Sequence, residues 1–313
     1  MKKVVVAMST YNGAKYVGAF IESIMNQTYG NIEFCIRDDG STDGTLDIIR
    51  SWQQKDFPGK TITLINDVTG VWGNMGAHPS YRFLFNHLPE ADYYILCDQD
   101  DVVMPDKIER AVAAMDKYPA NIPVMYAHSY YLCDGDLNVQ GTLPPLHSYT
   151  PEEMKHVNLA KVIMTGTWGG VGMAQACNSL LFHEAYCTPM EGIVAGDCWI
   201  SWVVAGLNGA FLFDEKPLAY YRRHEGTYSS GNANGLKRYQ DWKKHMRRHC
   251  DNITNGIWNY HHLFYDRVSS ERQYFLKTFV GKNRLRKFFY PHRLRENLLH
   301  EIAFRILILM GKI

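Results

Sequence analysis

Residues 4–45 read VVVAMSTYNGAKYVGAFIESIMNQTYGNIEFCIRDDGSTDGT, and this stretch decides the fold. Its apolar run at 4–8 predicts a buried strand, and IEFCI at 32–36 predicts a second. Between them, residues 14–27 carry apolar side chains at helical spacing. This order of strand, helix and strand is typical of a βαβ unit, in which both strands lie parallel in one sheet.

The same alternation continues along the chain. Residues 61–65 and 93–97 predict further strands, and residues 76–87 and 105–115 predict helices. The sequence therefore predicts an α/β fold with a mostly parallel central sheet flanked by helices, a Rossmann-like arrangement. Polar clusters follow the first, second and fourth strands. Ligands bind beyond the carboxyl ends of parallel strands, so these clusters mark the expected site.

The remainder of the chain is less regular. Residues 197–206 predict a helix, residues 210–213 a short strand and residues 220–235 a loop. The segment 236–313 is expected to be mostly helical, and it contains 17 Lys and Arg residues against 6 Asp and Glu. Residues 1–235 carry 16 against 26, so a basic segment follows an acidic body. Such an asymmetry indicates a polyanionic partner, either a membrane surface or a nucleic acid.

Composition excludes several other classes of protein. Seven cysteines are scattered without a C-x-x-C spacing, which argues against a zinc site or a redox motif and favours a reducing compartment. No apolar stretch approaches the roughly 20 residues that span a bilayer. The expected location is cytoplasmic, with attachment to a membrane surface left open.

The strongest chemical signal is DQDD at 98–101, directly after the strand YYILC. Clustered carboxylates at a strand end offer the hard oxygen ligands that Mg²⁺ and Mn²⁺ prefer. The alternative is a solvated acidic turn that caps the next helix. The position after a buried strand, beside two other polar strand ends, favours the metal site.

A second cluster, DDGSTDG at 38–44, ends the second strand. A carboxylate here can accept the imide N–H of uracil or thymine. Tyr11, at the end of the first strand, offers an aromatic face for the base. The alternative is a plain turn in which Asp43 serves as the N-cap of the next helix.

Residues 9–29 (STYNGAKYVGAFIESIMNQTY), 32–45 and 93–108 (YYILCDQDDVVMPDKI) resemble glycosyltransferase family 2, which has the GT-A fold. The resemblance covers about residues 3–117. It implies a UDP- or dTDP-sugar donor, with rhamnosyl transfer in polysaccharide biosynthesis as the nearest type. By position it implies that the nucleoside is contacted by Thr10, Tyr11, Asn12 and Asp39.

The resemblance also assigns the acidic cluster. Asp98 and Asp100 match the family's DxD motif, with Asp100 as the metal ligand, and Asp98 and Asp101 are expected at the nucleotide-sugar. The metal is Mn²⁺ or Mg²⁺, because both accept the same oxygen ligands.

Three further residues follow from weaker resemblance downstream. Asp197, in GDCW at 196–199, matches the family's Asp-x-Trp element and is expected to be the general base, which implies inversion at the anomeric carbon. Arg222 and His224, in YRRH at 221–224, match its late motif, with Arg222 at the diphosphate and His224 at the metal. The alternatives are a helix cap for Asp197 and a structural role for His224.

Tryptophans offer flat faces to sugar rings, but core packing is the simpler interpretation for each of them. The residues concerned are Trp168, Trp199 and Trp202.

We expect a catalytic domain at 1–230, with a nucleotide-binding half to about 117 and an acceptor half at 118–230, and a helical basic segment at 231–313. Within that segment, residues 282–310 combine seven Lys and Arg, six of them at 282–295, with aromatic and apolar residues, which suits an anionic membrane surface. The alternative is packing on the catalytic domain or on a second copy in a homo-oligomer. No nucleic-acid-binding motif accompanies the charge.

These motifs discriminate among three functional classes. The favoured one is a glycosyltransferase of surface polysaccharide synthesis that acts on a saccharide acceptor, expected to be lipid-linked, at the inner face of the cell membrane. A nucleotidyltransferase is disfavoured because STYNGAKY at 9–16 lacks the glycine-rich phosphate loop. A catalytically idle nucleotide- or sugar-binding subunit is the remaining alternative.

Overall fold

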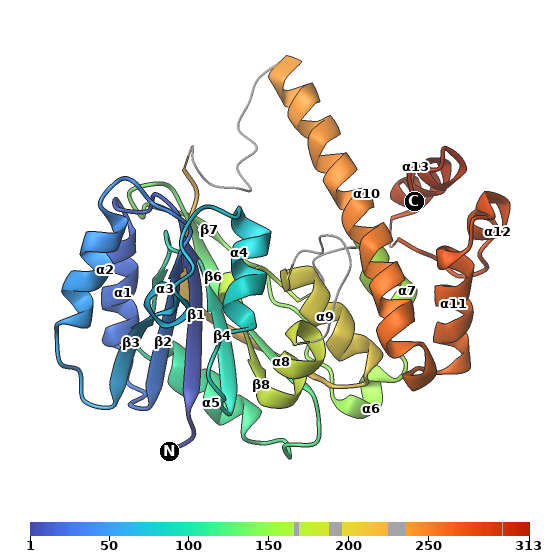
Figure 1. Cartoon of the computed structure of the whole chain (residues 1–313). Coiled ribbons are helices and arrows are strands. Elements are labelled where there is room, and N and C mark those ends of the chain that lie inside the picture. The colour runs from blue at the N-terminus through green and yellow to red at the C-terminus, as the bar shows by residue number, and fades with distance from the viewer. Residues whose placement is uncertain (166–168, 188–195, 225–235, 296) are drawn as a thin grey trace.

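The computed structural model describes residues 1–165, 169–187, 196–224, 236–295 and 297–313. One nine-stranded sheet forms its centre, and helices cover both faces (Figure 1). The strands are β1 (Val4–Thr10), β2 (Ile32–Asp38), β3 (Lys60–Leu64), β4 (Tyr93–Cys97), β5 (Val102–Val103), β6 (Val124–Cys133), β7 (Val139–Thr142), β8 (Gln175–Asn178) and β9 (Ala210–Arg222). The larger helices of the sheet region are α1 (Val17–Met25), α2 (Thr45–Gln53), α4 (Ala77–Phe85), α5 (Lys107–Met115), α7 (Leu159–Thr165), α8 (Ser179–Tyr186) and α9 (Gly196–Gly206).

The strand order is β3-β2-β1-β4-β8-β6-β9-β5, and β7 pairs with β6. β3, β2, β1 and β4 are mutually parallel, β8 runs antiparallel to both β4 and β6, and β9 is parallel to β6. The expected α/β class and mostly parallel sheet are confirmed. The reversal at β8 lets β6 and β9 return in the direction of β4, so their ends meet the nucleotide-binding half at one edge.

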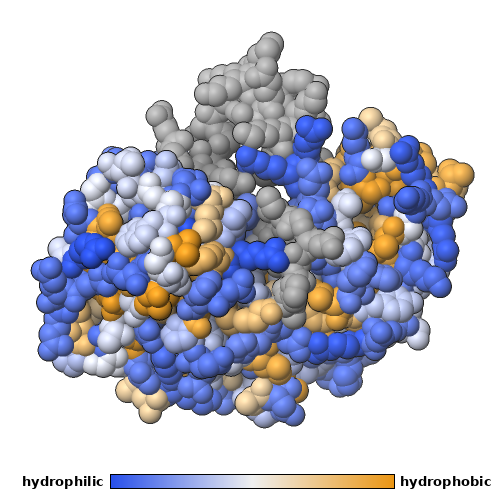
Figure 2. Space-filling model, in the orientation of Figure 1, coloured by the Kyte–Doolittle hydropathy of each residue, from blue (hydrophilic) through white to orange (hydrophobic). Residues whose placement is uncertain are grey.

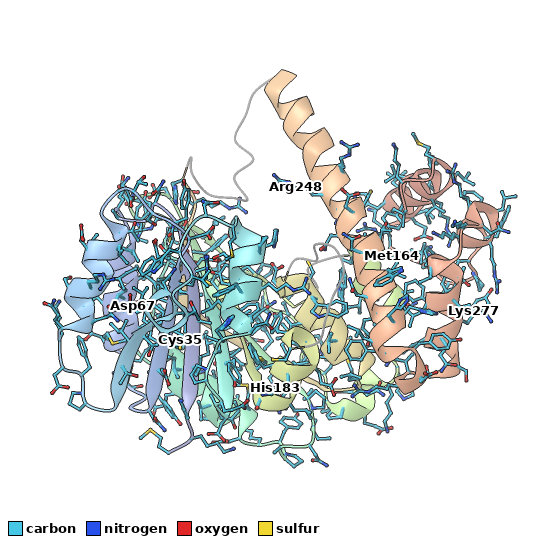
Figure 3. The ribbon with its side chains drawn as sticks, viewed as in Figure 1. Cys35, Asp67, Met164, His183, Arg248 and Lys277 are labelled. Atoms are coloured by element: carbon cyan, nitrogen blue, oxygen red, sulfur yellow. The ribbon has the colours of Figure 1, made fainter. Side chains whose placement is uncertain are left out.

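The sheet is buried on both faces. The buried apolar residues fall into two clusters, one under α1 and α5 and the other under α8 and α9. Consistent with this, six of the seven residues of β1 are buried, as expected of a strand that is covered on both faces. Cys35, labelled within the sheet in Figure 3, is buried in β2.

One local prediction was wrong. Residues 220–222 lie in β9 and not in a loop, because Tyr220 and Tyr221 pair with Tyr131 and Leu132 of β6. The N-cap position of α2 is Gly44, with φ of +87°, one residue after the predicted Asp43. The Asp43 carboxylate nevertheless accepts the N–H of Thr45, the first residue of α2, at 3.2 Å, and also the N–H of Ala14 at 3.0 Å.

The C-terminal helices are α10 (Leu236–Phe264), α11 (Ser270–Val280), α12 (Arg284–Phe288) and α13 (Leu298–Leu309). Figure 1 shows them beside α7 and α9, away from β1 to β3. α10 and α11 share an apolar core with those two helices, in which Met164 of α7 is fully buried (Figure 3). The buried Arg272 of α11 donates to the carbonyls of Ala205 and Met154 at 3.1 and 2.8 Å. Helix-to-domain packing, left open by the sequence, therefore applies to α10 and α11.

Two short α-helices and two 3-10 turns complete the described elements: α3 (Ile65–Thr69), α6 (Pro151–Met154), Gly172–Ala174 and Tyr265–Arg267. In the described parts of the chain, no helix is both long enough and apolar enough to cross a membrane.

Candidate active site

Three parallel strands bring the predicted polar residues together. Thr10 at the end of β1 pairs with Asp38 at the end of β2, and Met8 of β1 pairs with Cys97 at the end of β4. The loops after these strands therefore leave the same edge of the sheet. The N–H of Asp39 donates to the carbonyl oxygen of Thr10 at 2.8 Å, so the first two loops start as one hydrogen-bonded layer.

Gln99 fixes the loop after β1. Its Oε1 accepts the Tyr11 N–H at 2.9 Å, and its Nε2 donates to the Tyr11 carbonyl at 3.1 Å. The Thr10 hydroxyl also donates to Oε1. Gly13 is required nearby, because a Cβ there would lie 2.4 Å from Gln99 Oε1. Thr10 is buried, whereas Tyr11 is 47% exposed, so the aromatic ring of this loop is open to a ligand.

Asn12 joins the first loop to the second. It adopts a left-handed backbone conformation with φ of +45°, which Asn tolerates better than most residues. Its N–H donates to Ser41 Oγ at 2.9 Å, and its Oδ1 accepts the N–H of Thr42 at 2.9 Å. The two loops are thus held at a fixed separation.

Asp39 lies beneath these loops and is almost fully buried. Its Oδ1 accepts Arg37 Nη1 at 2.5 Å and the N–H of Met75 at 2.8 Å, and its Oδ2 accepts the N–H of Gly76 at 2.9 Å. Arg37 has 0% of its side chain exposed and also donates to Ser80 Oγ. Asp39 therefore anchors the loop before α4. A carboxylate accepts up to about four hydrogen bonds, and its direct contact with a base stays a prediction.

The acidic cluster after β4 concentrates negative charge. Burial and the neighbouring Asp100 carboxylate raise the pKa of Asp98 to about 7. Burial and the charges of Asp98 and Asp100 raise the pKa of Asp101 well above its usual value. The Tyr81 hydroxyl donates to Asp98 Oδ1 at 3.2 Å. Lys107, buried in the first turn of α5, opposes these increases with its positive charge. The carboxylates nevertheless remain undercompensated.

β9 brings Arg222 to this cluster. The Arg222 N–H donates to Asp101 Oδ1 at 2.9 Å, and its Nε donates to the Asp100 carbonyl at 2.6 Å. Its Nη1 binds the carbonyl of Gly135 at 2.6 Å, and the guanidinium lies 4.5 Å from the ring centroid of Tyr16. Arg222 is buried, so it holds the 98–101 turn in place. A contact with the diphosphate stays a prediction.

His224, two residues later, reaches the predicted metal ligand. Its Nε2 lies 2.9 Å from Asp100 Oδ2, and its ring centroid lies 4.8 Å from that of Tyr16. The two residues that the sequence assigned to the metal are therefore neighbours, although 124 positions separate them.

The cluster fits a divalent cation in part. The described residues contain no group of three His, Cys, Asp or Glu side chains at metal-ligand spacing. Asp100 and His224 supply two donors side by side, and Asp98 lies within electrostatic reach. Asp101 Oδ2 is buried and finds no hydrogen-bond partner among the described residues. Two protein ligands, close to further carboxylates, suit a divalent cation whose remaining coordination positions are open to phosphate oxygens.

Asp197 lies in the first turn of α9. Burial raises its pKa, and its Oδ1 accepts the N–H of Cys198 at 2.9 Å. Its charge contributes to the raised pKa of Asp98, and it lies within electrostatic reach of His78. α9 thus places this carboxylate near the acidic cluster, as a general base facing a donor sugar requires.

Two of the three tryptophans considered for sugar binding lie in the core. Trp199 and Trp202 are fully buried, so the core-packing interpretation is correct for both. Trp168 lies outside the described residues, as does the boundary predicted at 230 and 231.

The part of the chain that carries most of this site matches a known protein family. Residues 5–175 match the profile "Glycosyl transferase family 2". The chain belongs to glycosyltransferase family 2. The matched part is a glycosyltransferase domain, and it carries the loops after β1, β2 and β4.

Curated relatives agree. The chain is 23% identical over 260 residues to the dTDP-rhamnosyl transferase RfbG of Shigella flexneri, covering 80% of this chain and 84% of that protein. It is 29% identical over 244 residues to the UDP-Glc:alpha-D-GlcNAc-diphosphoundecaprenol beta-1,3-glucosyltransferase WfaP of Escherichia coli, covering 76% and 84%. A Haemophilus influenzae glycosyltransferase is 32% identical over 135 residues, 43% of this chain and about half, 49%, of that protein.

Solved structures show the same fold. Staphylococcus aureus TarS 1–349 in complex with UDP-GlcNAc superposes with a TM-score of 0.56 at 18% identity, over 99% of this chain and 90% of that one. The mannosyltransferase PcManGT of Pyrobaculum calidifontis, in complex with GDP-Man and Mn²⁺, gives 0.50 at 15% identity, over 99% and 86%. Family 2 and the GT-A fold, predicted from the motifs, are confirmed.

Several residues of the site give no clear signal in the sequence. Gln99 lies inside the DQDD motif, where its acidic neighbours give the stronger signal. Arg37, Tyr81 and Lys107 lie within predicted elements, where a single polar side chain gives no signal of its own. An unusual Arg directly before two Asp residues was the available hint for Arg37.

Proposed function

We propose that the protein is an inverting glycosyltransferase that moves a sugar from a UDP- or dTDP-sugar to a saccharide acceptor on a membrane lipid, in surface polysaccharide synthesis at the inner face of the cell membrane. The observation that carries the proposal is the contact of Asp100 with His224 within the acidic cluster, near the buried carboxylate of Asp197. The names of RfbG and WfaP support the two donor classes, and that of WfaP supports a lipid-linked acceptor.

Different residues of the chain would bind different parts of the donor. Tyr11, with Thr10, Asn12 and Asp39 behind it, would receive the base, since these side chains form the wall built from the first two loops. Asp98, Asp101 and Arg222 would line the nucleotide-sugar. Binding both substrates in fixed positions lowers the entropic part of the barrier.

Asp100 and His224 would hold Mn²⁺ or Mg²⁺, and the Mn²⁺ of PcManGT supports this choice. When bound, the cation would stabilise the charge of the departing diphosphate. The buried surroundings of the cluster strengthen that attraction.

Asp197 would act on the acceptor. Its carboxylate takes the proton of the attacking hydroxyl as that oxygen forms a bond to the anomeric carbon. The bond from this carbon to the diphosphate oxygen breaks on the opposite face, so the configuration inverts. Burial, which raises the pKa of Asp197, brings it nearer to the neutral range in which a general base works best.

A thermal-shift panel tests the donor site. UDP-, dTDP- and GDP-sugars are each added with Mn²⁺, Mg²⁺ or EDTA, since a ligand of the native state raises the melting temperature. We expect a metal-dependent shift with UDP- or dTDP-sugars that Asp100→Ala abolishes. Asp67→Ala is the matched control, because Asp67 is exposed on α3 and pairs with Arg50 at 3.1 Å (Figure 3 labels it).

The panel also decides between enzyme and idle subunit. A shift accompanied by release of UDP or dTDP in the presence of acceptor supports the enzyme. Binding without turnover for any acceptor would favour the idle subunit. If the folded protein shows no change in melting temperature with any of the nucleotide-sugars, the donor site is refuted. We further propose the domain boundaries 1–230 and 231–313, with a homo-oligomer as a state that light scattering would reveal.

A further inference from the structure

α13 is apolar on two sides, and the protein covers one of them. Phe304 and Ile308 are buried against the C-terminal helices. Glu301 is buried on the same side, where its Oε2 accepts the N–H groups of Leu294 and Arg295 at 2.8 and 2.7 Å. This inward side gives α13 a fixed place at the end of the molecule (Figure 1).

Arg305, the charge that interrupts the run IAFRILILM, is also turned inward. Its Nε donates to Glu301 Oε1 at 2.6 Å, and its Nη atoms bind the carbonyls of Phe288, Tyr290 and His292. These carbonyls lie at the end of α12 and in the loop after it, so Arg305 fastens α12 to α13. The outward side of α13 is therefore left without a charge.

That outward side is an uninterrupted apolar stripe. Its members follow at helical spacing, and Leu299 is 75% exposed. Leu285 of α12 and Phe289, the residue after this helix, add two apolar side chains, and Phe289 is 72% exposed. Figure 2 shows the corresponding orange surface at the upper right, where α13 lies in Figure 1. The set, hereafter the apolar stripe, comprises Leu285, Phe289, Leu298, Leu299, Ile302, Ile306, Leu309 and Met310.

Cations flank the apolar stripe. Gly311, just beyond α13, lies against Arg284, because a Cβ on Gly311 would be 2.4 Å from the Arg284 guanidinium. The N-terminal end of α12 is therefore beside the C-terminal end of α13. The exposed cations of this region are Lys282, Arg284, Arg286, Arg293 and Lys312. Among the described residues from 282 onward, Glu301 is the sole acidic side chain, and it is buried and paired.

A cationic cavity adjoins the other end of α13. Its volume is about 710 Å³, and it lies between the region of α6 and α7 and the start of α13. Four of its lining residues carry or can acquire positive charge, namely His156, Lys161, Arg295 and His300, against one carboxylate, that of Glu153. Positive charge is thus found at both ends of the apolar stripe.

We propose that the apolar stripe docks on an anionic lipid bilayer, with α13 lying in the plane of the interface and the cations of α12 against the lipid phosphates. An apolar helix face bordered by Lys and Arg binds anionic membranes in this manner. α13 has 12 residues, about 18 Å of helix, which is too short to span a bilayer but suits this orientation. A second copy fits less well, since a symmetric contact would bring the same cations together.

Vesicle flotation of the full chain tests the proposal without donor or acceptor. The protein is mixed with vesicles of phosphatidylglycerol and phosphatidylcholine in equal parts, or of phosphatidylcholine alone. We expect flotation with the anionic vesicles that decreases as salt is added, since the attraction is screened. Lys282→Gln with Arg284→Gln should weaken binding about thirty-fold, from two lost basic residues. Ile302→Ser with Ile306→Ser should weaken it about ten-fold, from the lost apolar area.

The matched control is Val68→Ser with Val139→Ser, which removes exposed apolar side chains from α3 and β7 and should leave flotation unchanged. Equal binding to both vesicle types, or no binding by folded wild-type protein, would overturn the proposal. The proposal would also be overturned if the wild-type protein were a dimer that the double variant Ile302→Ser with Ile306→Ser converts to a monomer. Flotation requires no sugar transfer. A failure to float would therefore not contradict the proposed transferase activity, and a loss of activity would not contradict the proposed docking surface.

Discussion

The buried pair of Arg37 and Asp39 allows a prediction with a defined magnitude. Arg37 and Asp39 expose 0% and 3% of their side chains, and their charged atoms lie 2.5 Å apart. Asp39→Asn keeps the shape of the side chain but leaves the guanidinium buried without its counter-charge. Removing one partner of a buried pair costs about 3–5 kcal/mol of unfolding free energy. We expect a loss in this range.

The double variant distinguishes charge from shape. Arg37→Met with Asp39→Asn removes the uncompensated charge, and replacing both partners of a buried pair is often neutral. We therefore expect the double variant to be more stable than Asp39→Asn alone by at least about 2 kcal/mol. Urea denaturation followed by tryptophan fluorescence measures both values.

Two results would refute this reasoning. The first is a loss below about 1 kcal/mol for Asp39→Asn, which would mean that water reaches the guanidinium. The second is a double variant less stable than Asp39→Asn alone, which would mean that the lost hydrogen bond from Arg37 to Ser80 outweighs the charge. The hydrogen bond from the Met75 N–H to Asp39 also links the pair to function. Weakening this bond should loosen the loop before α4, so both variants that replace Asp39 should bind a UDP-sugar more weakly.

Further predictions concern catalysis, pH and packing. Asp197→Asn should lower kcat by about 10²–10⁴-fold, with the donor KM nearly unchanged, because general-base catalysis is worth that much; an unchanged kcat in a transfer assay would exclude the role. Since burial raises the pKa of Asp197 and the base must be ionised, kcat/KM should fall as pH drops through a midpoint above 3.8, which a pH–rate profile will show. Gly206→Ala should destabilise the protein by about 1–3 kcal/mol, because its Cβ would lie 1.3 Å from the Tyr260 hydroxyl; Gly141→Ala, with nothing within 4 Å of its Cβ, is the control in thermal melts.

Local patterns were sufficient for the nucleotide-binding half. The strands at 4–8, 32–36 and 93–97 were predicted within two residues of their observed bounds, because each is a continuous apolar run buried on both faces. The polar clusters at their ends followed from the same argument. Residues 220–222 were misassigned because two Tyr and an Arg give no apolar run, and pairing with β6 and β5 makes them a strand.

The sequence by itself thus determined the family, the βαβ order and the presence of a carboxylate cluster, since these depend on neighbours along the chain. The tertiary structure decided which distant groups meet them. It brought His224 to Asp100, buried Arg37 beside Asp39, and turned Arg305 inward so that α13 presents an uncharged face. Whether a charge is paired, buried or exposed depends on side chains far away in sequence, because the electrostatic environment of a group is set by packing and not by local periodicity.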